Sequence, residues 1–176
     1  MWKWDKEKDG KFANENRTSN VWVRSMSGSN KRTRNYLNDA PALAMVRDKV
    51  CSVLNKTAPE TGVLTTQKIA QAEHFGSLRK HRFMVSPAGD GLDTHATWEA
   101  LLAGCIPVVP RSPSDPLFED LPVWLVDSWE EVTDEAVLRV EEEFKGKEYN
   151  WEKLFASGWH TEIHKGLCTI SPDETK

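Results

Sequence analysis

The chain has 176 residues, of which 39% are hydrophobic and 28% charged, a balance typical of soluble globular proteins and not of disordered or membrane ones. The net charge of −4 is small and Lys and Arg are scattered along the sequence, which argues against nucleic acid as the main partner. No run approaches the roughly 20 apolar residues that a transmembrane helix requires, so we expect a soluble chain.

The length suits one ordinary domain with its own hydrophobic core. Residues 1–18 are charged and aperiodic, so we expect a loose polar arm there, a single domain over residues 19–168 and a short tail over 169–176. Cys51, Cys105 and Cys168 show no metal-ligand spacing and are expected to be reduced thiols, the first two in the core. Most of the eight tryptophans fall at periodic positions, which favours packing over sugar stacking.

A regular alternation of strand and helix patterns begins near Asn20. The first half predicts a strand over 20–25, a turn at 27–30, a helix over 39–55 closed by Pro59, a strand over 62–66 and a helix over 67–80 that contains Gly76.

The second half continues the same alternation. A strand is expected over 81–86, and a helix begins after it with Asp93 or Thr94 as a capping residue. Trp98, Leu101, Leu102 and Cys105 are its predicted buried stripe, and Gly104 ends it. The remaining expected elements are a strand over 105–110, a loop over 111–121, a strand over 122–127 and helices over 128–144 and 150–167.

Strands of five or six residues that alternate with helices predict βαβ units and a parallel sheet covered on both faces. The expected fold is therefore a doubly wound, Rossmann-like α/β domain. Ligands of such domains bind beyond the carboxyl ends of the strands, where turns lead into helices.

One such turn combines small residues with a helix start. After Ser86, the glycines Gly89 and Gly91 allow a sharp turn and a close approach of ligand to backbone. The following helix directs its free amides toward the same space, which suits a pyrophosphate. The alternative is an ordinary βα turn, since glycine occurs in many of them.

His95 and Glu99 lie four residues apart and are expected on one face of this helix, opposite the apolar stripe. Glu99 is then placed to accept hydrogen bonds from the hydroxyls of a ribose. The alternatives are a solvated Glu99 and a His95 that caps, packs or contacts phosphate, and the pair alone is not a sufficient metal site.

The stretch from Phe83 to Val109 resembles the signature of the exostosin-like glycosyltransferases of family 47. The shared features are Ser-Pro, a glycine-rich turn, Asp-x-x-x-x-x-Glu-Ala-Leu and Gly-Cys-Ile-Pro-Val, in this order. The likeness continues more loosely from Val21 to Ile163, and a loop with Arg32 or Arg34 resembles the one after the first strand of that domain.

The resemblance implies the C-terminal, donor-binding lobe of a two-lobed (GT-B type) glycosyltransferase. It implies transfer of a sugar from a nucleotide-sugar, commonly a UDP-sugar, to a hydroxyl of a glycan or glycoprotein acceptor, with no further cofactor. Relatives of this family in eukaryotes are usually Golgi proteins. The positions that it assigns to the nucleotide-sugar are Arg32, Arg34, Ser86, Gly89, Asp90, Gly91, Asp93, Thr94, His95 and Glu99.

The sequence departs from the family pattern at two points. Ala96 stands where the pattern has Arg, which removes a cation from the phosphate end of the site. About 150 residues of α/β domain leave no room for an acceptor lobe, so we expect the catalytic base to lie outside this chain. The alternative function is a non-catalytic, degenerate module that binds a nucleotide or a partner protein. A dehydrogenase or methyltransferase is disfavoured, because the turn after the first strand lacks the Gly-x-Gly-x-x-Gly fingerprint.

Overall fold

A computed structural model describes residues 18–23, 47–64, 70–88 and 91–169 of the chain. Its strands are β1 (Thr18–Val23), β2 (Gly62–Leu64), β3 (His81–Val85), β4 (Ile106–Pro110) and β5 (Trp124–Val126). Its α-helices are α2 (Arg47–Thr57), α3 (Gln71–Leu78), α4 (His95–Leu102), α5 (Asp134–Phe144) and α6 (Ala156–Thr169). Short 3₁₀ helices are η1 (Asp115–Phe118), η2 (Trp129–Glu131) and η3 (Trp151–Leu154).

The strands form one five-stranded sheet in the order β2-β1-β3-β4-β5, and every neighbouring pair is parallel. The predicted α/β class and parallel sheet are thereby confirmed. The chain passes from β1 to β2 toward one edge of the sheet, and from β3 through β4 to β5 toward the opposite edge. The direction of winding therefore reverses between β1 and β3. In such sheets this reversal opens a crevice above the carboxyl ends of the two strands.

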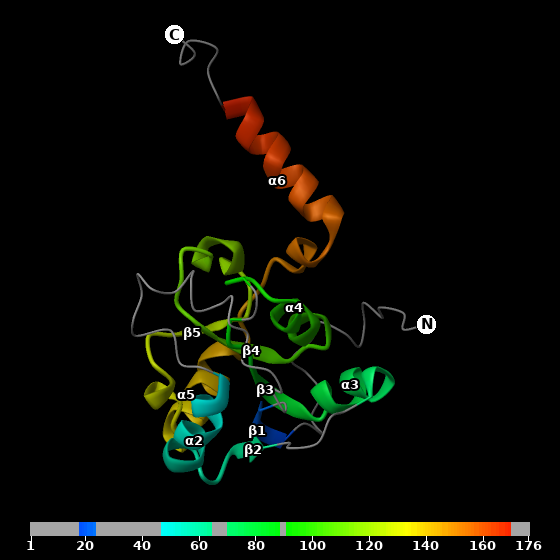
Figure 1. Cartoon of the computed structure of the whole chain (residues 1–176). Coiled ribbons are helices and arrows are strands. Elements are labelled where there is room, and N and C mark those ends of the chain that lie inside the picture. The colour runs from blue at the N-terminus through cyan, green and yellow to red at the C-terminus, as the bar shows by residue number, and fades with distance from the viewer. Residues whose placement is uncertain (1–17, 24–46, 65–69, 89–90, 170–176) are drawn as a thin grey trace.

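Helices cover both faces of the sheet (Figure 1), as expected for a doubly wound domain. On one face α2 and α5 pack against alternate strand residues such as Val21, Val23 and Phe83. On the other face α3 and α4 pack against Trp22 and Met84. The alternation of Val21, Trp22 and Val23 between the two faces follows from the two-residue period of a strand.

The turn that ends α4 places the next strand. Gly104 has φ of 71° and donates its amide to the Leu101 carbonyl, while the amide of Cys105 donates to Ala100 at 2.8 Å. This is the Schellman arrangement, in which glycine tolerates the left-handed backbone that the turn requires. The predicted role of Gly104 is confirmed, and the Cys105 side chain that follows is fully buried.

Several predicted elements differ in detail from the observed ones. The helix expected over 128–144 is interrupted: η2 ends at Glu131, and Thr133 caps a new helix by accepting a hydrogen bond from the Ala136 amide. The helix expected over 150–167 breaks at Phe155, whose backbone is extended between η3 and α6. The loop expected over 111–121 contains η1. At the two helix breaks, a cap or an extended residue takes the place of a helical hydrogen bond.

Other expectations concern burial and boundaries. Ala70 is extended, so α3 begins at Gln71, later than predicted. Cys51 is only partly buried, and in α4 the fully buried residues are Thr97, Ala100 and Leu101, while Trp98 and Leu102 are partly exposed. The turn at 27–30 and the predicted ends of four elements, at 24–25, 39–46, 65–66 and 67–69, lie outside the described residues. Three of the tryptophans, Trp22, Trp124 and Trp129, are buried in the core, as the packing interpretation predicts.

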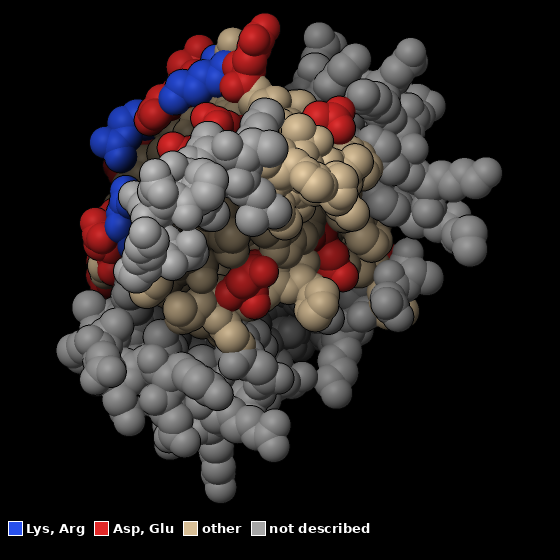
Figure 2. Space-filling model, turned by 90° about the horizontal axis from the view of Figure 1, so that it is seen from above, with Lys and Arg blue, Asp and Glu red and all other residues tan. Residues whose placement is uncertain are grey.

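The helix α6 extends away from the sheet and its covering helices (Figure 1). Its first turn rests on η3, and Trp159 contacts the edge of Trp98 on α4 with ring centroids 6.4 Å apart. Among the described residues, no helix has the length and apolar character needed to cross a bilayer. Figure 2 shows that the described Lys and Arg residues on one face gather among Asp and Glu, while the rest of that face is largely uncharged with separate acidic groups.

Candidate functional site

The candidate site lies where β3 ends and α4 begins, at the edge of the sheet where the parallel strands have their carboxyl ends. β3 ends at Val85 beside β1, which ends at Val23, so this turn borders the point of reversed winding. The segment after β1, with Arg32 and Arg34, lies outside the described residues, as do Gly89 and Asp90. Six predicted site residues are described: Ser86, Gly91, Asp93, Thr94, His95 and Glu99.

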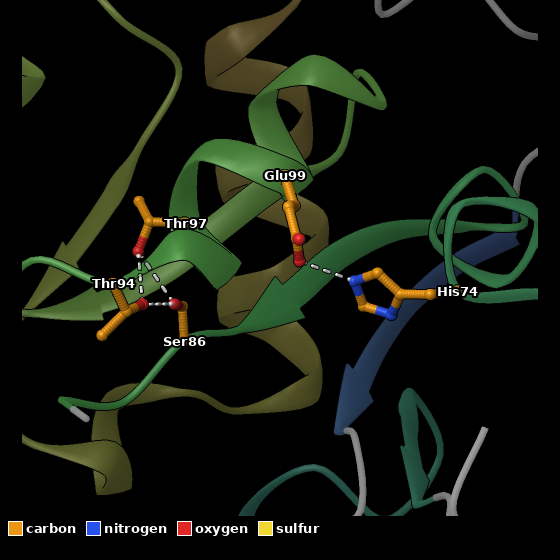
Figure 3. Close-up of polar contacts among 5 residues, drawn as sticks. All are labelled: His74, Ser86, Thr94, Thr97 and Glu99. Atoms are coloured by element: carbon orange, nitrogen blue, oxygen red, sulfur yellow. Dashed lines mark hydrogen bonds and ion pairs between the residues drawn. The ribbon is translucent and has the colours of Figure 1, made fainter. Parts of the chain in front are cut away.

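Three hydroxyl groups join the end of β3 to the first turn of α4 (Figure 3). The Oγ of Ser86 lies 3.1 Å from Oγ1 of Thr94 and 2.8 Å from Oγ1 of Thr97, and the two threonine hydroxyls are 3.3 Å apart. Ser86 and Thr97 are each 1% exposed. We call these three residues the hydroxyl triangle. The hydrogen bonds among these hydroxyls connect the turn to α4 and satisfy buried polar atoms. Ser86 therefore supports the turn from the buried side and is not itself exposed to a ligand.

The hydroxyl triangle leaves the start of α4 without a side-chain cap. Thr94 occupies the capping position, but its side chain makes no hydrogen bond to an amide of the first turn. The expectation that Thr94 or Asp93 caps the helix through its side chain is therefore wrong, because Thr94 is engaged by Ser86 and Thr97 and Asp93 by another partner.

The first turn of α4 differs in this respect from that of α5. In α5, Thr133 caps the helix and Asp134 and Glu135 stand in the first turn, whereas the first turn of α4 contains no acidic residue. Uncapped amides at a helix start carry partial positive charge and attract anions. The start of α4 is therefore suited to a negatively charged ligand such as a phosphate group.

Asp93 accepts a hydrogen bond from the indole nitrogen of Trp98 at 2.7 Å. The Trp98 ring in turn packs against Phe118 of η1, with ring centroids 5.8 Å apart. Asp93 thus fixes the last part of the turn to the layer formed by α4 and η1. Its carboxylate is exposed, and this contact directs one of its oxygens toward Trp98.

Glu99 lies between α4 and α3 and contacts a histidine that the sequence reasoning did not single out. Its Oε2 is 3.0 Å from Nε2 of His74, which is 5% exposed (Figure 3). Nδ1 of His74 is buried and makes no hydrogen bond within the described part of the chain. The Glu99 side chain remains 33% exposed, so its second oxygen is accessible for a further contact.

The remaining described positions are Gly91 and His95, both exposed. A Cβ placed on Gly91 would meet only the Asp93 carbonyl oxygen, at 3.7 Å, and the backbone of Gly91 is not left-handed. The turn itself therefore does not require glycine at this position. Glycine at this position leaves the backbone without a side chain, which favours a close approach of a ligand.

Sequence reasoning missed His74, Thr97 and Trp98 as parts of this site. Thr97 stands three residues after Thr94 on the same helix, a spacing that indicates contact. His74 gave no such signal, because it is 25 residues from Glu99 and lies on a different helix. Only the packing of α3 beside α4 on one face of the sheet brings the two together.

Two cavities lined by described residues lie away from the turn after β3. One open cavity of about 450 Å³ is lined by Trp124, Glu131 and the start of α5, and a second of about 260 Å³ lies between η3 and α6. Neither touches the turn after β3. Within the described residues, no group of three or more His, Cys, Asp or Glu side chains is placed to hold a metal ion.

No protein-family model matches the chain, and no curated protein is similar to it at a significant level.

Proposed function

We propose that this chain is the donor-binding lobe of a glycosyltransferase of GT-B type and that it takes a nucleotide-sugar, in particular a UDP-sugar. The observation that carries the proposal is the uncapped, acid-free start of α4 at the carboxyl edge of β3. It is supported by the ordered sequence features from Phe83 to Val109, which run through this turn and helix.

In this proposal each part of the donor meets one part of the turn. The diphosphate lies over Gly91 and accepts hydrogen bonds from the first-turn amides of α4, whose dipole stabilises its charge. The ribose hydroxyls donate to Glu99, which is held on its other side by His74 at 3.0 Å. Arg32 or Arg34 supplies a cation to the leaving diphosphate.

The reaction that fits these roles is sugar transfer to a hydroxyl by direct displacement at the anomeric carbon. The acceptor oxygen forms the new bond while the bond to the diphosphate breaks, and a base takes the hydroxyl proton. We assign that base to an acceptor-binding lobe outside this chain. The contribution of this chain is then to bind the donor and stabilise the leaving group, on the order of 3 kcal/mol for each good contact.

A second candidate function is a non-catalytic module that binds a nucleotide without transferring a sugar. It is favoured by Ala96, which takes the place of a phosphate-facing arginine in the family pattern, at the second position of α4. Replacing Ala96 with Arg restores this cation. Because charge-assisted hydrogen bonds contribute about 1.5–3 kcal/mol, we expect Ala96→Arg to tighten UDP binding by roughly tenfold or more.

Isothermal titration of the full chain with UDP tests the binding proposal, with Gly91→Ala and Gly76→Ala as a matched pair. An added methyl at Gly76, on α3, meets nothing within 4 Å, and at Gly91 it meets only a van der Waals neighbour, so both variants should fold. We expect Gly91→Ala to weaken UDP binding by about tenfold, since 1.4 kcal/mol corresponds to that factor, and Gly76→Ala to leave it unchanged.

Two results contradict the proposal. The first is no binding of UDP to the unmodified chain at about 1 mM, the weak limit of specific recognition. The second is equal weakening by Gly91→Ala and Gly76→Ala, which would place the ligand elsewhere. Binding of UDP with no effect of Ala96→Arg would leave the nucleotide site in place and contradict the role given to a cation at that position.

A further inference from the structure

Two histidines on α6 bring the same ring nitrogen, Nε2, close together. His160 and His164 lie one helical turn apart, and their Nε2 atoms are 3.1 Å from each other. The ring centroids are 4.2 Å apart and the ring planes are inclined by 61°. Both side chains are exposed, as are Thr161, Glu162 and Ile163 between them.

This separation of the nitrogens matches two ligands of one metal ion. Zinc–nitrogen bonds to histidine are about 2.0–2.1 Å long. A point about 2.05 Å from both Nε2 atoms would see them at an angle of about 98°, because half of their 3.1 Å separation is the opposite side of the right triangle. That angle lies between the octahedral and the tetrahedral values, so the separation of the two nitrogens suits one ion.

The alternative is a hydrogen bond between the two imidazoles. It requires one ring to carry its proton on Nε2 and the other to present a bare Nε2, and it contributes little at an exposed site, about 0.5–1.5 kcal/mol at most. A metal ion uses the lone pairs of both nitrogens with the same ring positions. Two histidines four residues apart on a helix are a recognised ligand pair for zinc.

We propose that His160 and His164 form a binding site for a divalent late transition-metal ion, with Zn²⁺, Ni²⁺ and Cu²⁺ as the chemical class. Imidazole nitrogen suits these ions, whereas Mg²⁺ and Ca²⁺ prefer oxygen ligands. With two protein ligands the ion keeps open positions for water or for a group from another molecule. The affinity should be highest for Cu²⁺, by the general order of divalent ions.

Binding should also stabilise α6. An ion held by residues one turn apart links successive turns of the helix and opposes their opening. Because the side chains from His160 to His164 are all exposed, this part of α6 gains little from packing, and a link of this kind has a measurable effect there. This inference does not depend on the nucleotide proposal.

The test is calorimetric titration of the full chain with NiCl₂, ZnCl₂ and CuCl₂, and with MgCl₂ as the control ion. All variants carry Cys168→Ser, because Cys168 belongs to the same helix and thiolates bind these ions as well. We expect one ion per chain and no heat with MgCl₂. His164→Ala should weaken binding by at least about tenfold, since even changes beyond the direct ligands cost 10- to 100-fold.

A composition-matched control exchanges two residues, Thr161→His together with His164→Thr. It keeps the number of histidines and the net charge, places no carboxylate one turn from His160, and moves the second imidazole about 100° around the helix from the position above His160. We expect it to bind as weakly as His164→Ala, while His95→Ala, on α4, binds like the parent. Hydrogen exchange of the α6 amides should slow on addition of Ni²⁺ in the parent and in His95→Ala, but not in His164→Ala or the exchanged variant.

Equal affinity of the parent and the exchanged variant would overturn the proposal, since histidine content and not geometry would then explain binding. Unchanged affinity in His164→Ala would overturn it as well. Circular dichroism of both variants checks that α6 is retained, as expected for substitutions of exposed side chains.

Discussion

The contact between Glu99 and His74 leads us to predict that substitutions of Glu99 change both the melting temperature of the chain and its affinity for UDP. His74 is 5% exposed, and within the described residues its Nδ1 has no hydrogen-bond partner, so Glu99 provides the hydrogen bond at its other nitrogen. Glu99→Ala removes that partner. A buried polar group left without a partner costs about 1–3 kcal/mol of stability.

The expected change in melting temperature follows from the size of the chain. For about 150–250 residues, 1 kcal/mol corresponds to roughly 2–4 °C, which gives a loss of about 2–12 °C for Glu99→Ala. Because the Glu99 side chain is 33% exposed, water can take over part of the lost contact. We therefore expect the lower half of that range, about 2–7 °C.

Glu99→Gln separates the hydrogen bond with His74 from the proposed contact with the ribose. Its amide oxygen can still accept a hydrogen bond from His74, so its melting temperature should stay within about 2 °C of the parent. It lacks the charge that strengthens hydrogen bonds from ribose hydroxyls, so UDP binding should weaken by at least about tenfold in both variants.

Differential scanning fluorimetry without ligand and calorimetry with UDP measure these two effects. An unchanged melting temperature in Glu99→Ala would refute the contact with His74. Unchanged UDP affinity in Glu99→Gln would refute the ribose role while leaving the contact in place.

Three further predictions concern residues outside the candidate site. Gly158→Ala should lower the melting temperature by about 2–12 °C, because its Cβ would overlap a backbone carbonyl of η3, whereas Gly76→Ala, in open space, should not lower it. Equal effects of the two variants would contradict the close packing of α6 on η3. Burial lowers the pKa of His81, so the folded state binds fewer protons than the unfolded one, and the free energy of unfolding should fall as the pH drops below about 6.5. His81→Phe, which keeps a ring stacked on Trp22, should reduce this loss of stability. Identical stability profiles against pH for the parent and His81→Phe would refute the assignment to His81. Burial raises the pKa of Tyr149 to about 12, so stability should fall as the pH rises from about 10 through this value, and Tyr149→Phe should remove the corresponding ultraviolet titration step; a step near 10 for Tyr149 would contradict its burial.

Helix ends show where sequence reasoning succeeded and where it failed. The role of Gly104 was predictable because the turn after α4 needs a left-handed residue, a demand set by the backbone alone. The interruption at Thr133 was missed because the apolar period continues through it from Val132 to Val137, so the amphipathic pattern does not mark the break.

The same division applies to the candidate site. The position of the turn after Val85 and the helix start at His95 follow from local patterns of strand, glycine and helix. The hydrogen-bond partner of the Thr94 side chain was not predictable, because its hydroxyl can bond either to the amides of its own helix or to the hydroxyl of Ser86. The choice between them depends on how close α4 packs to β3.

The sequence by itself determined the order of strands and helices, the parallel character of the sheet and the position of the turn between β3 and α4, because these depend on periodicity and backbone preference over a few residues. Only the tertiary structure decided that the winding reverses between β1 and β3, that the hydroxyl triangle leaves α4 uncapped and that His74 holds Glu99. These features depend on contacts between segments far apart in the chain, which are set by the packing of helices on the sheet and leave no local pattern in the sequence.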